Sequence, residues 1–255
     1  LESHTDNGEL KVLKARVLIA RKTLPAAQQA RMLLNQIVAE SPDQAEVWEL
    51  LGRLELEQKQ YGNAMDVALR GLAHNPDDRL LLLLKADAEA LRSPMLAVPT
   101  LRELLRQDPN DLQALARLAD ANSKSDRPDK TQELLQLLQE RQMVLEGPAR
   151  KRCGMILAVT LYRSGRIDDA TAQFEALMKA DPNDPAPLLT LVQLPDSLRR
   201  CPRLRQFIDD WTTSHPDDAR TPAVMAAAWI AVRDEEGMRL GENLLRSVLQ
   251  RTPES

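Results

Sequence analysis

Apolar residues recur in this chain at fixed distances before a series of prolines. The residue twelve before is mostly small, and those eight and five before are mostly large. Because steps of four and three residues stay on one face of a helix, the pattern predicts an amphipathic helix ahead of each proline. The eighth and fifth positions hold Leu34, Ala68, Leu101, Phe174, Ile208 and Leu245, and Ile37, Gly71, Leu104, Leu177, Trp211 and Val248.

The residues after the prolines predict a second helix. The sixth position holds Trp48, Leu82, Leu115, Gly154, Leu188 and Pro222, and the tenth holds Gly52, Ala86, Ala119, Ala158, Val192 and Ala226. Small residues at the tenth position allow two helices to approach closely. Acidic or amide residues directly after the prolines, as in SPDQ, NPDD and DPND, favour helix starts because they cap free N–H groups.

The prolines themselves are periodic. They stand at 42, 76, 109, 148, 182, 216 and 253, at intervals of 34, 33, 39, 34, 34 and 37 residues. A period near 34 is typical of stacked helical hairpins, so we expect an all-α, right-handed α-solenoid of about seven repeats. The expected organisation is an N-terminal tail, 1–8, and one solenoid domain, 9–253, with units at 9–43, 44–77, 78–110, 111–147, 148–183, 184–217 and 218–253.

The second unit resembles a tetratricopeptide repeat. The match rests on Trp48, Leu51, Gly52, Tyr61, Ala64 and Pro76. Other units depart from the motif, with Lys85 in place of the usual leucine, Pro94 and Pro99 near the turn of the third unit, an inserted QMVLEGP, and a break at Pro195. The resemblance implies that the first helices line a concave face that binds a peptide or a partner's helix.

A run of five leucines, Leu80–Leu84, stands out from the polar background. It is far shorter than the roughly 20 apolar residues that cross a bilayer, and charged residues follow at once, so we expect no membrane insertion. Leu82 takes the buried motif position, and Leu81 and Leu84 can pack between units. Leu80 and Leu83 are left over and are predicted to point to the concave side.

Composition narrows the class of function. Aromatic residues make up only 3% of the chain. The net charge of -4 argues against a nucleic-acid partner, although basic residues cluster at 150–152 and 199–205. The two cysteines have no metal-type spacing, and the predicted fold places them about 20 Å apart, too far for a disulfide. The chain has no Gly-rich phosphate loop, and its three histidines are widely separated. We therefore expect no enzyme activity, cofactor, metal or small-molecule substrate.

If the motif positions are buried, the residues between them line the groove. The predicted partner-binding residues are Glu46, Glu49, Arg53, Leu80, Leu83, Asp87, Asp120, Arg152 and Tyr162. The position eleven after each proline carries no asparagine, so the carboxylate-clasping activity of some family members is not expected.

The predicted function is a soluble, non-catalytic scaffold of bacterial type that binds a protein or peptide partner. The alternative is a spacer or assembly array of a larger enzyme or of a secretion or envelope component, because both ends look cut from a longer array. Cytoplasmic and periplasmic locations both fit the composition.

Overall fold

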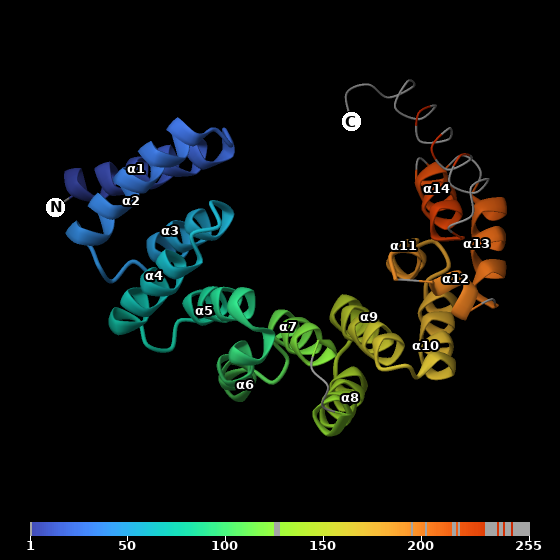
Figure 1. Ribbon diagram of the computed structural model, residues 1–255. Coiled ribbons are helices and arrows are strands. Elements are labelled where there is room, and N and C mark those ends of the chain that lie inside the picture. The colour runs from blue at the N-terminus through green and yellow to red at the C-terminus, as the bar shows by residue number, and fades with distance from the viewer. Residues whose placement is uncertain are drawn as a thin grey trace. The chain divides into compact units, whose positions relative to one another are not determined.

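The fold is all helical. A computed structural model describes residues 2–124, 128–194, 196–201, 203–215, 218, 220–232, 239, 242 and 246, and every regular element in them is a helix (Figure 1). This confirms the predicted all-α repeat fold. The chain divides into two compact units, Leu1–Arg127 and Pro128–Ser255, and the boundary falls inside the repeat predicted at 111–147. The arrangement of 9–253 as seven repeats of one domain stays a prediction.

Unit 1 consists of paired helices. The first helices α3 and α5 each pack against the second helix of their own pair and against that of the preceding pair, as α3 packs against α4 and α2. Residues 2–8, expected to be a tail, belong to the first helix. The elements are α1 (Glu2–Ala20), α2 (Leu24–Glu40), α3 (Ala45–Glu57), α4 (Tyr61–His74), α5 (Arg79–Arg92), the 3-10 helix η1 (Pro94–Ala97), α6 (Val98–Gln107) and α7 (Leu112–Ser123).

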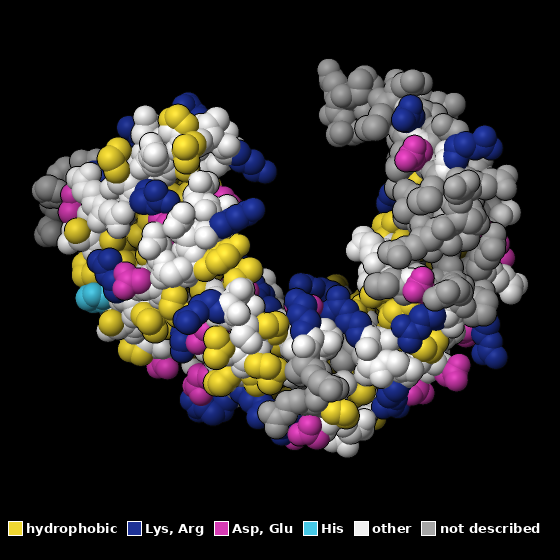
Figure 2. All heavy atoms as spheres, in the orientation of Figure 1, with side chains coloured by type: hydrophobic (Ala, Val, Ile, Leu, Met, Phe, Trp, Pro, Cys, Tyr) yellow, Lys and Arg dark blue, Asp and Glu magenta, His cyan; other side chains and the backbone are white. Residues whose placement is uncertain are grey.

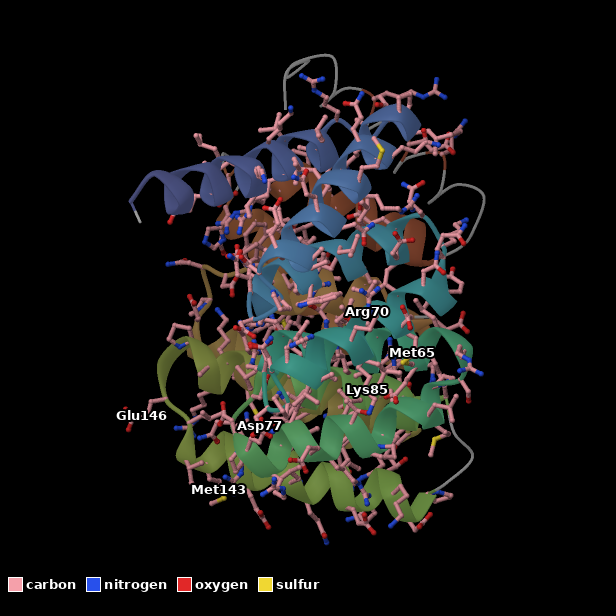
Figure 3. The ribbon with its side chains drawn as sticks, turned by 90° about the vertical axis from the view of Figure 1, so that its left-hand side faces the viewer. Met65, Arg70, Asp77, Lys85, Met143 and Glu146 are labelled. Carbon is pink, nitrogen blue, oxygen red and sulfur yellow. The ribbon has the colours of Figure 1, made fainter. Side chains whose placement is uncertain are left out.

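The second repeat shows why the motif residues are needed. Trp48 on α3 is 2% exposed, and its indole N–H donates to the carbonyl oxygen of Pro42 at 2.7 Å. Gly71 of α4 faces it so closely that a Cβ added there would lie 2.9 Å from the Trp48 Cβ. The guanidinium of Arg70, which is labelled in Figure 3, lies 5.0 Å from the centroid of the Trp48 ring. The glycine therefore permits the close approach of α3 and α4.

Acidic caps begin two of the first helices, as the sequence predicts. Asp78 accepts a hydrogen bond from the Leu81 N–H at 3.0 Å. Asp111 accepts from the N–H groups of Gln113 and Ala114, at 2.9 and 3.1 Å. These bonds satisfy backbone donors that the first turn of α5 and of α7 leaves free.

The third repeat accommodates its departures from the motif locally. The Nζ of Lys85, a residue labelled in Figure 3, lies 3.7 Å from Oε1 of Glu89. The Thr100 hydroxyl donates a hydrogen bond to Oε2 of Glu89 at 2.7 Å. Pro94 begins η1, which leads directly into α6. The polar residues are thus paired with one another, and the prolines lie at helix starts where they cost little.

The leucine run forms the buried part of α5. Leu81 to Leu84 are at most 7% exposed, whereas Leu80 is 37% exposed. The prediction that Leu83 points to an open concave surface is wrong, because its exposure is 0%. α5 packs against α3, α4, η1 and α6, which cover more of its circumference than one hairpin partner would. Within the described residues, no helix is long and apolar enough to cross a membrane.

Unit 2 begins with a regular stack, α8, α9 and α10. Cys153 on α9 and Cys201 after α12 are buried and free, which confirms that they do not form a disulfide. The predicted break at Pro195 lies outside the described residues, as do Pro202, Pro216 and Pro253. The elements are α8 (Pro128–Val144), α9 (Gly147–Arg163), α10 (Ile167–Ala180), α11 (Ala186–Val192), α12 (Ser197–Arg200), α13 (Arg203–Ser214) and α14 (Thr221–Val232).

Candidate functional site

A chain of ion pairs joins three first helices of unit 1, α3, α5 and α7. Arg53 pairs with Glu49 of its own helix, and its Nη1 lies 3.9 Å from Oδ2 of Asp87 on α5. Asp87 also accepts hydrogen bonds from Nε and Nη2 of Arg117 on α7, at 2.6 and 2.9 Å. The hydrogen bond with Asp87 raises the pKa of Arg117, so this guanidinium stays charged. Three of the predicted groove residues therefore bond to one another or to a neighbouring repeat.

Two further ion pairs link neighbouring first helices of unit 1, from α1 to α3 and from α5 to the start of α7. Arg16 of α1 pairs with Glu46 of α3, which is exposed as predicted. Arg79 of α5 donates to both carboxylate oxygens of Asp111 at 2.6 and 3.0 Å. Burial raises the pKa of Asp111, but the hydrogen bonds from Arg79 and from the Ala114 N–H outweigh it, and the pKa lies below its usual range. The charged side chains on this surface are thus held in defined positions.

A cavity of about 260 Å³ lies between α5, η1, α6 and α7. Its walls include five alanines, 86, 90, 97, 116 and 121, which leave the space open because their side chains are short. Asp87, Arg117, Asp120 and Lys124 also line it. The cavity brings together two predicted partner-binding residues, Asp87 and Asp120. We define this cavity with its four charged residues as the alanine cavity.

The remaining predicted residues are distributed differently. Leu80 is partly exposed on α5, but Leu83 is buried. Arg152 and Tyr162 belong to unit 2, where Arg152 is exposed and Tyr162 is only 2% exposed. The Arg200 guanidinium lies 4.7 Å from the centroid of the Tyr162 ring, and burial raises the pKa of the Tyr162 hydroxyl. Tyr162 is therefore a packing residue and not an exposed contact.

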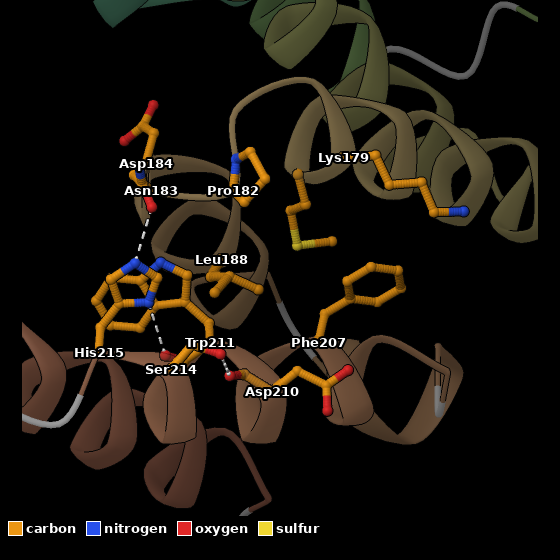
Figure 4. A pocket seen from close by; sticks show the side chains of 11 residues that line it. Lys179, Pro182, Asn183, Asp184, Leu188, Phe207, Asp210, Trp211, Ser214 and His215 are labelled. Atoms are coloured by element: carbon orange, nitrogen blue, oxygen red, sulfur yellow. Dashed lines mark hydrogen bonds between the residues drawn. The ribbon is translucent and has the colours of Figure 1, made fainter.

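Unit 2 holds a second cavity, of about 510 Å³, which the repeat pattern did not predict (Figure 4). Phe207, Trp211 and His215 line it, and the Trp211 and His215 rings stack with their centroids 4.7 Å apart. The His215 Nε2 lies 2.9 Å from Oδ1 of Asn183. Phe207, Trp211 and His215 are four residues apart in the sequence, a spacing that places three rings on one side of a helix. This spacing could have indicated the cavity, because aromatic residues are rare in this chain.

The described residues contain no group of three or more His, Cys, Asp or Glu side chains placed to hold a metal ion. Burial raises the pKa of both cysteine thiols, which disfavours the reactive thiolate at neutral pH. Unit 1 therefore combines an apolar cavity between α5, η1, α6 and α7 with fixed charges of both signs.

Comparisons with known proteins agree with this architecture. The tetratricopeptide repeat family model matches residues 26–88. No curated protein matches the chain. Solved structures with the same fold include a tetratricopeptide repeat protein from Parabacteroides merdae, at 15% identity and a TM-score of 0.62, covering 96% of this chain and 99% of that one.

Two other solved structures show the same fold. The C-terminal part of a repeat protein from Cytophaga hutchinsonii is 10% identical with a TM-score of 0.57, covering 97% of this chain and 96% of that one. MamA from Desulfovibrio magneticus is 17% identical with a TM-score of 0.53, covering 68% and 94%. Identities this low show the fold alone. Residues 26–88 therefore match the tetratricopeptide repeat family, and the chain has the helical fold of tetratricopeptide repeat structures.

Proposed function

We propose that the chain is a non-catalytic scaffold that binds a protein partner through the first helices of unit 1. The observation that carries the proposal is the alanine cavity. It offers an apolar socket bordered by acidic residues, Asp87 and Asp120, and by basic ones, Arg117 and Lys124. A partner segment with one apolar side chain between charged neighbours fits this combination, because interfaces commonly bury an apolar anchor inside a polar rim.

The size of the cavity favours a side chain of a longer partner over a free small molecule. Its volume of about 260 Å³ is below the range of about 300–1,000 Å³ that is typical of small-molecule sites. The bidentate bond between Arg117 and Asp87 already fixes both side chains. Binding therefore costs little side-chain entropy at these two positions.

Site-specific photo-crosslinking tests the proposal. A photoreactive residue replaces the exposed Ala116 at the cavity and, in a matched control, the exposed Ala73 of α4. Each protein is irradiated in an extract of the source organism, and mass spectrometry identifies the crosslinked peptides. We expect one partner segment to crosslink at Ala116 and not at Ala73.

A blocking variant then tests whether the cavity itself binds that partner. Ala116→Trp places an indole in the opening of the cavity, and we expect it to weaken binding of the purified partner about tenfold or more, equivalent to about 1.4 kcal/mol. Ala73→Trp should bind normally, and both variants should keep the wild-type melting temperature because both alanines are exposed. Equal crosslinking at the two positions, or full binding by Ala116→Trp, contradicts the proposal.

A further inference from the structure

A further cavity in unit 2, of about 650 Å³, lies between the end of α8, the start of α9 and α10. Pro148, Arg150, Ala176, Leu177 and Ala180 line it, and we call it the α10 cavity. It opens at the surface, since both of its alanines are exposed. Its volume lies within the range of about 300–1,000 Å³ that is typical of small-molecule sites, whereas the alanine cavity falls below that range.

The repeat that forms the α10 cavity can be aligned with the second repeat without a gap. α4 spans Tyr61–His74 and α10 spans Ile167–Ala180, so both helices begin and end 106 residues apart. The turn that leads into each of them contains a residue with positive φ, Lys59 in one repeat and Gly165 in the other, again 106 residues apart. Equivalent positions in the two repeats can therefore be compared directly.

In the second repeat, a tryptophan ring fills the equivalent place. The Trp48 indole N–H donates to the carbonyl oxygen of Pro42, and Gly71 lies against the root of the side chain. The Arg70 guanidinium lies over the ring, and the His74 ring stacks on it with the centroids 6.4 Å apart. The equivalents of these four neighbours all line the α10 cavity and are Pro148, Ala176, Leu177 and Ala180. The cavity thus occupies the site that an indole ring occupies in the second repeat.

This site is open because three side chains are shorter than in the second repeat. Gly154 stands in the place of Trp48, and Ala176 and Ala180 stand in the places of the two residues that cover its ring. A Cβ added at Gly154 would lie 3.0 Å from Cδ2 of Leu177, so the leucine covers the glycine from the side of α10. A ring that fills the open part of the site therefore has to come from a ligand.

A cation at the rim of the α10 cavity has no acidic partner. The Nζ of Lys151 lies 2.9 Å from Oδ2 of Asp181 and also pairs with Asp184. Arg150 is exposed and makes no ion pair with any residue whose side chain the structure describes. Figure 2 shows Lys and Arg side chains at the surface over α9 and α10. A carboxylate that reaches Arg150 would form a charge-assisted hydrogen bond there.

We propose that the α10 cavity binds a small molecule that consists of a planar aromatic ring of indole size and a carboxylate. The ring lies against Ala176, Leu177 and Ala180, as the Trp48 indole lies against their equivalents, and the carboxylate pairs with Arg150. A volume of about 650 Å³ holds both groups, whereas a single side chain of a partner would leave much of it empty. The α10 cavity shares no residue with the alanine cavity, so this inference does not depend on the function proposed for that cavity.

Ligand-observed NMR titrations of the full 255-residue chain test the inference with four probes. Indole-3-acetate carries both groups, indole lacks the carboxylate, and cyclohexylacetate lacks the planar ring. We expect indole-3-acetate to bind at least about tenfold more tightly than either of the other two, because only it satisfies both halves of the site. The fourth probe, N-acetyltryptophanamide, represents a tryptophan within a partner protein. It should bind no better than indole, and tighter binding than that of indole-3-acetate overturns the proposal.

Three variants then locate the binding site. Arg150→Glu should weaken binding of indole-3-acetate about tenfold and leave binding of indole unchanged. Ala180→Trp fills the cavity with an indole of the chain itself and should abolish binding of both probes. Ala172→Trp, at an exposed position of α10 outside the cavity, is the matched control and should bind both probes normally. All three variants should keep wild-type helicity because the three positions are exposed.

Three results contradict the proposal. The first is the absence of saturable binding of indole-3-acetate to the wild-type chain. The second is equal binding of indole-3-acetate and cyclohexylacetate, which would show that the site does not select a planar ring. The third is binding of indole-3-acetate to Ala180→Trp as tight as to Ala172→Trp, which would place the ligand outside the α10 cavity.

Discussion

Two glycines of α4 make a matched test of how closely the helices of the second repeat pack. A Cβ added at Gly62 meets nothing within 4 Å, whereas one added at Gly71 lies 2.9 Å from the Cβ of Trp48 and 3.0 Å from its Cγ. Gly62→Ala should therefore gain only the lower backbone entropy of alanine, which stabilises the helix by about 0.5–1 kcal/mol. Gly71→Ala receives the same gain and also overpacks the core.

The cost at Gly71 is high because Trp48 cannot move aside. The contacting atoms lie at the root of its side chain, and the indole N–H is fixed by the hydrogen bond to Pro42. Overpacking costs about 1–3 kcal/mol, so the net effect of Gly71→Ala is a loss of about 1 kcal/mol. The two variants should then differ by about 2 kcal/mol in free energy of unfolding, with the wild-type chain between them.

Urea unfolding followed by circular dichroism measures this difference. Repeat arrays can unfold in parts, so amide hydrogen exchange over residues 45–74 provides a second, local measurement. Exchange in this segment should be faster in Gly71→Ala and slower in Gly62→Ala than in the wild-type chain. If Gly71→Ala proves as stable as Gly62→Ala, Trp48 yields to the added methyl group and the close approach of α3 and α4 is not the reason for glycine at this position.

Three other predictions concern charges and thiols. The pKa of Asp111 is lowered in the folded chain, so the stability that the chain gains from the Asp111–Arg79 pair is complete above the ordinary Asp pKa of about 3.9. This stability is lost as the pH falls further. Urea unfolding should therefore show that Asp111→Asn is clearly less stable than wild type at pH 7 and close to wild type near pH 2. Asp87→Lys should lower the free energy of unfolding by about 1–3 kcal/mol because it places a cation beside Arg117. Asp66→Lys, at an exposed ion pair, should change the free energy of unfolding by less than about 0.5 kcal/mol. Equal effects of the two variants in urea unfolding would contradict the role of burial. Both cysteines are buried and their pKa values are raised by burial, so Ellman's reagent should label them only after unfolding, and rapid labelling of the native chain would refute this.

Features that depend only on one helix and its hairpin partner could be predicted from the sequence. The burial of Trp48, Ala64 and Ala68 follows from their distances to the prolines, because those distances define the face that each helix presents to its hairpin partner. The acidic caps at Asp78 and Asp111 were predictable for the same reason, since a cap acts within its own first turn.

Contacts between neighbouring repeats were harder to predict. Asp87 and Arg117 are 30 residues apart, and they meet only because α5 and α7 are rotated by a particular amount relative to each other. The position of a residue within its repeat predicts the side of the helix on which it lies, but it does not predict how neighbouring helices are rotated relative to each other. The same limit explains why Leu83 and Tyr162, predicted as groove contacts, are buried by neighbouring helices.

Once the register is known, an exposed apolar residue can be judged against its equivalents. Leu69 is 49% exposed and Leu10 is 64% exposed, so exposure alone does not identify a packing surface. Leu69 stands seven residues before a proline, a position held by the exposed Asn35 and Arg102 in the neighbouring repeats. Leu10 stands at a position where the next repeat buries Val47, because α1 ends at Ala20 and α3 ends 37 residues later at Glu57. Single exposed leucines are ordinary on protein surfaces, but an apolar residue exposed where its equivalents are buried indicates a surface that a helix can cover. The repeat register therefore separates Leu10 from ordinary exposed leucines such as Leu69.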